Sequence, residues 1–183
     1  MAHGSTIALV LAAALTLSGG AFAGTLAEGQ GKAESEWLDA HNRERAQFGS
    51  APLQWNADLA DEARQWARQL AREERLRHTS SEERNRTGEN LWMGTAGRYA
   101  PSAMIDSFVD EKRHFRAGRF PQVSRTGNWA DVGHYTQIVW SETREVGCAS
   151  ARGLRFDVLV CRYWPAGNII GTPIAPGRRI AQR

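Results

Sequence analysis

Apolar residues recur at helical spacing in three parts of the chain. The first series ends at Gly49, a residue type suited to the left-handed position that closes a helix; it comprises Trp37, Leu38, His41, Arg45 and Phe48. The second series follows Asn56, a good helix N-cap, and comprises Leu59, Ala63, Trp66, Ala67 and Leu70. The third opens at Pro101, which suits a first helical position, and runs to about Phe115. We therefore expect three helices before residue 116.

Two stretches near the end of the chain have the pattern of β-strands. They cover Glu145–Ser150 and Leu154–Tyr163. In the second, apolar residues alternate with charged ones, which is typical of a strand with one buried face. The preceding stretch, Arg116–Asp131, is rich in turn residues and indicates a long loop. Helices first and a short antiparallel pair late predict an α+β domain built in layers.

The first residues have the pattern of a secretory signal peptide. Ile7–Leu17 is an uncharged apolar run, and Ala21 and Ala23 are small residues at the cleavage positions. The run is shorter than the ~20 apolar residues that a membrane span needs, and no later run is long enough. We therefore divide the chain into a signal peptide (1–23), a short leader (24–33), one domain (34–174) and a loose tail (175–183). We expect the mature protein to be secreted or, in a bacterium, periplasmic.

The charge pattern bears on a nucleic-acid partner, and the cysteine count bears on disulfide formation. The formal net charge is +3 at pH 7, and arginines are interleaved with acidic residues along the predicted helices. Such interleaving is typical of solvated helix faces, so we expect no nucleic-acid partner. The chain has two cysteines, Cys148 and Cys161. In an exported protein this even count favours one disulfide.

Two dense motifs in the last third of the chain resemble a known family. Residues 133–143 (GHYTQIVWSET) resemble the first signature of the CAP superfamily, which comprises cysteine-rich secretory proteins, antigen 5 and plant pathogenesis-related class-one proteins. Residues 158–169 (VLVCRYWPAGNI) are similar to the second signature. Upstream, residues 41–45 (HNRER) resemble the opening helix of the family, and residues 88–92 (GENLW) resemble its glycine-glutamate-asparagine segment.

The resemblance covers about residues 35–171 and carries structural expectations. It implies an α-β-α sandwich, in which a small antiparallel sheet lies between helical layers. It also implies that Cys148 and Cys161 are joined across the late strand pair.

A central cleft with two histidines and two glutamates is a further implication of the resemblance. By their positions relative to the motifs, these residues are His78, Glu89, Glu111 and His134. Glu111 has support from spacing as well, because it falls on the apolar stripe of the third predicted helix. A buried carboxylate needs a cation, a metal or a hydrogen-bond donor beside it.

Two physical interpretations of this cluster remain open. Imidazole nitrogens together with carboxylate oxygens suit a divalent metal ion, above all Zn²⁺, with His78 and His134 as ligands. Equally, each histidine can pair with a glutamate that fixes its tautomer, without any metal. We expect no organic cofactor and assign no residue a catalytic role.

Three other aromatic side chains invite a functional interpretation. His41 lies on the apolar stripe of the first helix, where a hydrogen-bonded core histidine is expected. His114 lies among basic residues and is expected to be exposed. Trp129 lies in the long loop and is the tryptophan that we expect to contact a ligand.

Three functions fit these residues. The resemblance implies a secreted module that binds a small apolar or lipid molecule, such as a sterol or fatty acid, in defence or in contact with a host or environment. The alternative is an extracellular protease-like or esterase-like hydrolase, in which a His–Glu pair would activate a serine, a threonine or a metal-bound water. Ser80, Ser81 and Ser102 are the candidate serines, by proximity in sequence only. The sequence lacks the G-x-S-x-G nucleophile elbow, and we favour binding over catalysis. The third function is signalling or adhesion with a vestigial cleft, and the sequence identifies no partner protein.

Overall fold

A computed structural model describes residues 20–80, 82–84 and 86–176. The helices are α1 (Gly20–Phe48), α2 (Ala57–Glu73), α3 (Pro101–Val109) and α4 (Gly133–Ile138), with the 3₁₀ turns η1 (Asp110–His114) and η2 (Trp129–Val132). The strands are β1 (Gln54–Trp55), β2 (Gly88–Thr95), β3 (Gly118–Arg119), β4 (Glu145–Arg152), β5 (Phe156–Trp164) and β6 (Pro173–Ile174). One sheet has the order β1-β4-β5-β2, and β3 pairs with β6 in a separate ribbon.

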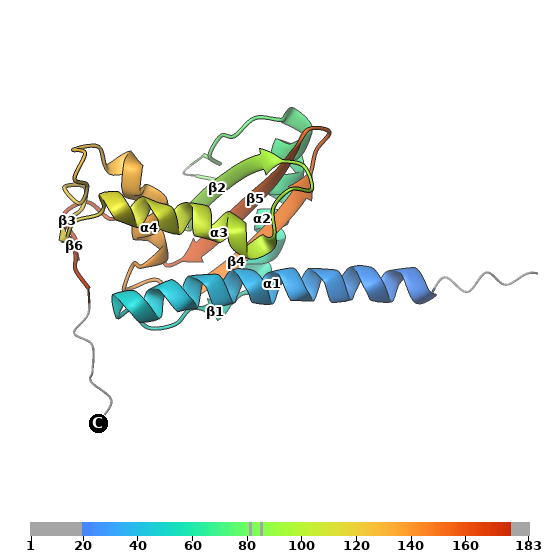
Figure 1. The fold of residues 1–183 in the computed structure, drawn as a ribbon, viewed down its shortest axis with the longest axis horizontal. Helices are drawn as coiled ribbons and strands as arrows, with labels where there is room; N and C mark the ends of the chain where they lie inside the picture. The colour runs from blue at the N-terminus through green and yellow to red at the C-terminus, as the bar shows by residue number, and fades with distance from the viewer. Residues whose placement is uncertain (1–19, 81, 85, 177–183) are drawn as a thin grey trace, which may run out of the picture.

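The main sheet lies between helices on both of its faces (Figure 1). α2 covers one face, where its apolar stripe packs against Val158 and Val160 of β5. On the other face, Trp37 of α1 and Ile105 of α3 share an apolar cluster with Leu159 of β5. Adjacent residues of β5 reach opposite clusters because side chains alternate along a strand. The molecule is therefore an α-β-α sandwich, and the predicted fold class is confirmed.

The sequence of α2 accounts for the start, the end and the buried face of this helix. Asn56 caps the helix by accepting the backbone N–H of Leu59 at 3.1 Å. The left-handed backbone of Glu74 ends it, and the N–H of Glu74 donates to the C=O of Leu70. The buried face includes every member of the series predicted from spacing: Leu59, Ala63, Trp66, Ala67 and Leu70.

The predicted disulfide is confirmed. Cys148 of β4 lies opposite Cys161 of β5, both side chains are buried, and their sulfurs are bonded. Closing a loop of this length stabilises the folded state by about 3 kcal/mol, because it restricts the unfolded chain.

α1 begins earlier than its apolar pattern predicted. The apolar series starts at Trp37, whereas the helix starts at Gly20 and includes the whole predicted leader (24–33). Alanine, glutamate, glutamine and lysine in that stretch have high helix propensity, and they extend the helix despite its glycines. Most of the predicted signal peptide and of the predicted tail lies outside the described residues. Within the described part of the chain, no helix is both long and apolar enough to cross a membrane.

The third predicted helix changes from an α-helix to a 3₁₀ turn before its predicted end. α3 stops at Val109, and the chain continues as the tighter turn η1. Glu111 therefore lies on a 3₁₀ turn and not on an α-helical stripe as predicted. The tertiary hydrogen bonds of its carboxylate, described below, account for the change because they fix the position of η1 against α4.

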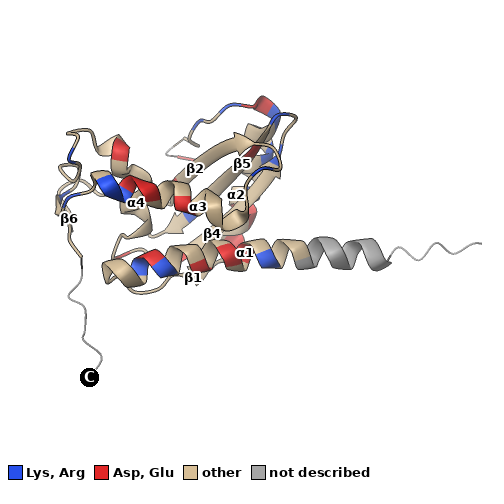
Figure 2. Ribbon diagram, in the orientation of Figure 1, with Lys and Arg blue, Asp and Glu red and all other residues tan. Residues whose placement is uncertain are grey.

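Charged residues of both signs are dispersed over the fold. Figure 2 shows acidic and basic positions interspersed along α1 and around α3, without a continuous stripe of one sign in that view. This arrangement agrees with the expectation of solvated helix faces.

Candidate functional site

The main cleft of the molecule combines a polar part with an apolar part. Its volume is about 630 Å³. The polar residues that line it include His78, Glu89, Asn90, His134 and Gln137. The apolar residues that line it include Phe120, Pro121, Trp129 and Ile170. A concave site of this size, with apolar walls and a few convergent polar groups, is suited to a small molecule.

The first histidine of the cleft is held by a buried glutamate. His78, in the segment after α2, places Nδ1 2.7 Å from Oε1 of Glu89 at the start of β2. Glu89 also accepts the N–H of Thr79 at 3.0 Å and its hydroxyl at 2.7 Å, and Oε2 lies 3.2 Å from Nη2 of Arg162. Burial would raise the pKa of the Glu89 carboxyl. The donors His78 and Thr79 and the charge of Arg162 outweigh burial, so the pKa lies below its usual value.

The second histidine is held in the same way from another part of the chain. Nδ1 of His134, in α4, lies 2.6 Å from Oε1 of Glu111. Oε2 of Glu111 accepts the backbone N–H groups of His134 at 3.0 Å and Tyr135 at 3.1 Å, so it also satisfies donors in the first turn of α4. Phe108 stacks on the His134 ring with 4.7 Å between centroids. The ring is thus fixed on two sides.

An ion pair ties η1 to the first helix and so supports Glu111. Nζ of Lys112 lies 3.0 Å from the buried Glu44 of α1, and the Tyr135 hydroxyl donates to the same carboxylate at 3.4 Å. Burial and the neighbouring Glu44 charge raise the pKa of Tyr135, which keeps the hydroxyl protonated. The position of Glu111 therefore depends on packing between α1, η1 and α4.

In both histidines Nδ1 is hydrogen-bonded to a glutamate carboxylate, so Nε2 is the ring nitrogen left for a ligand. When Nδ1 carries the proton that the carboxylate accepts, Nε2 carries a lone pair. Within the described residues, Nε2 of neither His78 nor His134 has a hydrogen-bond partner. The carboxylate oxygens of Glu89 and Glu111 are already engaged by protein donors. The four predicted residues therefore form two His–Glu pairs, and both histidines line one cleft.

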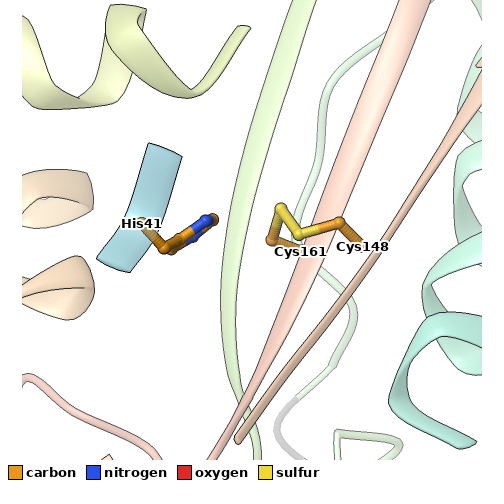
Figure 3. A group of neighbouring side chains, drawn as sticks. All are labelled: His41, Cys148 and Cys161. Carbon is orange, nitrogen blue, oxygen red and sulfur yellow. A yellow bond between two sulfur atoms is a disulfide. The ribbon is translucent and has the colours of Figure 1, made fainter. Parts of the chain in front are cut away.

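The two pairs do not make a compact ligand cluster. No three of the four predicted residues place a ligand atom each within 4.8 Å of one another. The group within the described residues that does so is His41, Cys148 and Cys161, shown in Figure 3.

This second group is not suited to a metal. The sulfurs of Cys148 and Cys161 are bonded to each other, so neither is a thiolate. Nδ1 of His41 lies 2.7 Å from the C=O of Trp37, and Nε2 lies 2.8 Å from the Tyr163 hydroxyl, so both ring nitrogens are occupied. His41 is thus the hydrogen-bonded core histidine that the sequence predicted.

The remaining candidates fall outside the cleft, with one exception. The Ser80 hydroxyl donates to Glu83, Ser102 does not line the cleft, and Ser81 lies outside the described residues. His114 is half-buried on η1, whereas the sequence predicted an exposed residue. Trp129 is 47% exposed and lines the cleft, and its contact with a ligand stays a prediction.

Sequence reasoning missed three polar residues that organise the site. Thr79 and Arg162 hold Glu89, and Asn90 donates to the Tyr163 hydroxyl and to the C=O of His134. Arg162 could have been found from strand alternation. It shares the α2-facing side of β5 with Val158 and Val160, and a buried arginine at such a position requires an acidic partner.

Comparison with known proteins places the chain in a family. A profile of the cysteine-rich secretory protein family, CAP, matches residues 38–163. Pathogenesis-related protein 1B of Nicotiana tabacum is 35% identical over 140 residues, which cover 75% of this chain and 78% of the tobacco protein. Pathogenesis-related protein 1 of Arabidopsis thaliana is 35% identical over 136 residues, which cover 74% of this chain and 78% of that protein.

Solved structures share the fold at lower sequence identity. The structure of BmVAL-1 superimposes with a TM-score of 0.66 at 22% identity, over 78% of this chain and 81% of that protein. The crystal structure of NaASP2 with Zn²⁺ superimposes with a TM-score of 0.67 at 24% identity, over 79% of this chain and 85% of that protein. Together with the sequence matches, these likenesses show that the chain belongs to the CAP family.

Proposed function

We propose that this protein is a secreted binding module. Its cleft takes a small apolar or lipid molecule of the sterol or fatty-acid kind and can hold a divalent metal ion on His78 and His134. The observation that carries the proposal is the arrangement of the cleft, in which two imidazoles adjoin an apolar wall and their Nε2 atoms have no hydrogen-bond partner among the described residues. A defence role is in keeping with the pathogenesis-related names of the plant relatives.

The residues of the cleft fit a metal such as Zn²⁺. Neutral imidazole is a preferred zinc ligand, and a carboxylate on the other ring nitrogen orients the ring and raises its basicity. Glu89 and Glu111 occupy those outer positions, so they would act through the rings. The crystal structure of NaASP2 with Zn²⁺, which shares this fold, supports this choice of metal. The ion would supply a Lewis acid able to polarise an oxygen of a bound molecule.

The apolar wall is the part of the cleft suited to a hydrocarbon ligand. Phe120 is buried and packs edge-to-face against Trp129, with 5.4 Å between ring centroids. Ile170 is 81% exposed beside them. Covering exposed apolar surface of this kind stabilises a complex through the hydrophobic effect.

Replacing Trp129 with alanine is expected to weaken the binding of an apolar probe by about tenfold or more, because burial of an aromatic side chain contributes roughly 1.5–3 kcal/mol. The measurement is a fluorescence titration with cis-parinaric acid. Trp164→Ala is the matched control, since Trp164 is 41% exposed but does not line the cleft. Equal losses in both variants, or saturable binding that Trp129→Ala leaves unchanged, would contradict the proposed ligand surface.

The hydrolase alternative has less support. Within the described residues, neither cleft histidine is hydrogen-bonded to a serine, threonine or cysteine side chain, and the Thr79 hydroxyl donates to Glu89 instead. We expect the purified protein to give no saturable turnover on a panel of esters and peptides. Turnover that is present in the wild type and lost in His78→Asn would favour the hydrolase, and the half-exposed position of His78 makes that variant compatible with folding.

A further inference from the structure

Arg84 is the strongly basic residue of the main cleft. It lies in the segment between α2 and β2, is half-buried, and lines the cleft together with His78. No other lysine or arginine among the described residues lines this cleft. Burial is the main cause that lowers the pKa of Arg162, and repulsion from Arg84 adds to the decrease. The Arg84 guanidinium therefore lies near the Glu89–Arg162 pair that supports His78.

The guanidinium of Arg84 makes no ion pair or hydrogen bond within the described part of the chain. Its sequence neighbours Glu82 and Glu83 do not neutralise it. Glu82 is exposed, and the carboxylate of Glu83 accepts the backbone N–H and the hydroxyl of Ser80 at 3.3 and 2.8 Å. Arg84 therefore offers a positive charge and several N–H donors that a ligand can occupy.

The other polar side chains of the cleft already have partners inside the protein. Glu89 is the only described carboxylate that lines the cleft, and its side chain is fully buried against Thr79 and Arg162. The remaining polar groups are bonded within the fold: Thr87 to the C=O of Arg84, Asn90 to the C=O of His134, Gln137 to the N–H of Gly167, and Asn168 to the C=O of Gly133. A ligand in the cleft therefore meets the charge of Arg84 and the Nε2 atoms of the two histidines.

This unneutralised charge bears on the head group of a ligand. A hydrocarbon ligand that covers the apolar wall also removes water from Arg84, and desolvating a guanidinium without a counter-charge costs free energy. A neutral head group, such as a sterol hydroxyl, brings no counter-charge. A carboxylate brings one, and it can accept two parallel N–H groups of the same guanidinium.

We propose that Arg84 makes the cleft selective for an amphiphile with an anionic head group, of the fatty-acid kind and not the neutral sterol kind. The carboxylate pairs with Arg84, and the hydrocarbon chain lies on the wall that contains Phe120 and Trp129. This inference rests on the proposed function, because it requires a hydrocarbon ligand in the same cleft, and it narrows the class of that ligand. A divalent ion on the two histidines would add positive charge to the cleft and favour the same head group.

The test is a calorimetric titration that compares decanoate with 1-decanol at pH 8. The two molecules have chains of equal length, and at this pH the carboxyl group is ionised. EDTA in the buffer removes divalent ions, so the comparison does not depend on the metal. The wild type is expected to bind decanoate about tenfold or more tightly than decanol, because a hydrogen bond to a charged group contributes at least that factor.

Substitutions at Arg84 separate the head group from the chain. Arg84→Gln keeps a polar side chain without the charge, so decanoate binding is expected to weaken about tenfold or more while decanol binding stays unchanged. Decanol binding also reports that the cleft of this variant is folded. Arg84→Lys keeps the charge without the planar fork, and we expect it to retain part of the preference. Arg86→Gln is the matched control, because Arg86 is exposed and does not line the cleft, and it should keep the wild-type preference.

The possible failures of this inference and of the proposed function are distinguishable. Equal binding of decanoate and decanol by the wild type would overturn the inference and leave hydrocarbon binding in place. A preference that Arg84→Gln retains, or that Arg86→Gln loses to the same degree, would overturn the role assigned to Arg84. Binding of neither molecule to the wild type would contradict both the inference and the proposed function.

Discussion

Replacing Arg45 with leucine is expected to lower the free energy of unfolding by about 3–5 kcal/mol. The side chain is fully buried, and it donates to the C=O groups of Ala51, Ile138, Trp140 and Thr143 at 2.6–3.0 Å. Burial lowers the pKa of Arg45 to about 10, so the guanidinium is still charged at neutral pH. Leucine would leave these carbonyls without their donor, and those of Ile138 and Trp140 lie at and just after the C-terminal end of α4, the helix that carries His134.

Urea denaturation measures this loss, with Arg43→Leu as the matched control on the same helix. Arg43 is half-exposed and pairs with Asp106 at the surface, so its loss is expected to cost less than about 1 kcal/mol. Arg45→Lys keeps a charge but offers one compact ammonium group, and we expect intermediate stability. If Arg45→Leu and Arg43→Leu unfold at the same urea concentration with equal slopes, the role assigned to Arg45 is wrong.

Stability is expected to fall by about 3 kcal/mol between pH 6.5 and pH 4 because of one buried histidine. Burial is the main cause that lowers the pKa of His41 to about 4 from its ordinary 6.5. Between these two values the unfolded chain binds a proton at this position and the folded chain does not, so acid favours unfolding. Nε2 of His41 accepts from the Tyr163 hydroxyl, which itself accepts from Asn90, and a protonated ring would disrupt this chain of donors.

The measurement is the free energy of unfolding at pH 7, 5.5 and 4 for the wild type and His41→Gln. Glutamine does not titrate, so the decrease between pH 6.5 and 4 should become about 3 kcal/mol smaller in that variant. His114→Gln serves as the control and should keep the wild-type decrease. A pH dependence that is the same in His41→Gln and in the wild type would refute this explanation.

The sequence predicted well those elements whose pattern is local. The α2 stripe from Leu59 to Leu70 repeats with a helical period, and the structure buries each predicted member. β5 was recognised because its apolar and polar residues alternate. The disulfide followed from the family resemblance, and both cysteines occupy paired positions of β4 and β5.

Elements whose conformation depends on contacts with residues distant in the sequence were not predicted from local spacing. β2 begins with Gly88, Glu89 and Asn90, which give no alternating apolar pattern. All three are buried beside β5, and Glu89 and Asn90 hydrogen-bond to the cleft residues His78 and His134. The turn at Glu111 likewise depends on donors in α4. Local spacing cannot show such contacts, which exist only once the layers have packed.

The candidate site likewise combines residues that the sequence identified with residues that it did not. The resemblance identified four residues, and the structure joins them as two pairs from segments far apart in the chain. The residues that position these pairs, such as Thr79 and Lys112, carry no motif of their own. They become visible only through the hydrogen bonds and the ion pair that they make.

Calorimetric titration with Zn²⁺ tests most directly whether the two histidines form one metal site. The wild type is expected to bind one ion, and His134→Ala is expected to bind at least about a hundredfold more weakly, because losing a ligand exceeds the 10–100-fold loss typical of its supporting groups. His114→Ala, which changes a histidine outside the cleft, should retain wild-type affinity. Equal affinity in the wild type and His134→Ala, or no binding to either at millimolar Zn²⁺, would contradict the account and leave two hydrogen-bonded His–Glu pairs without a metal.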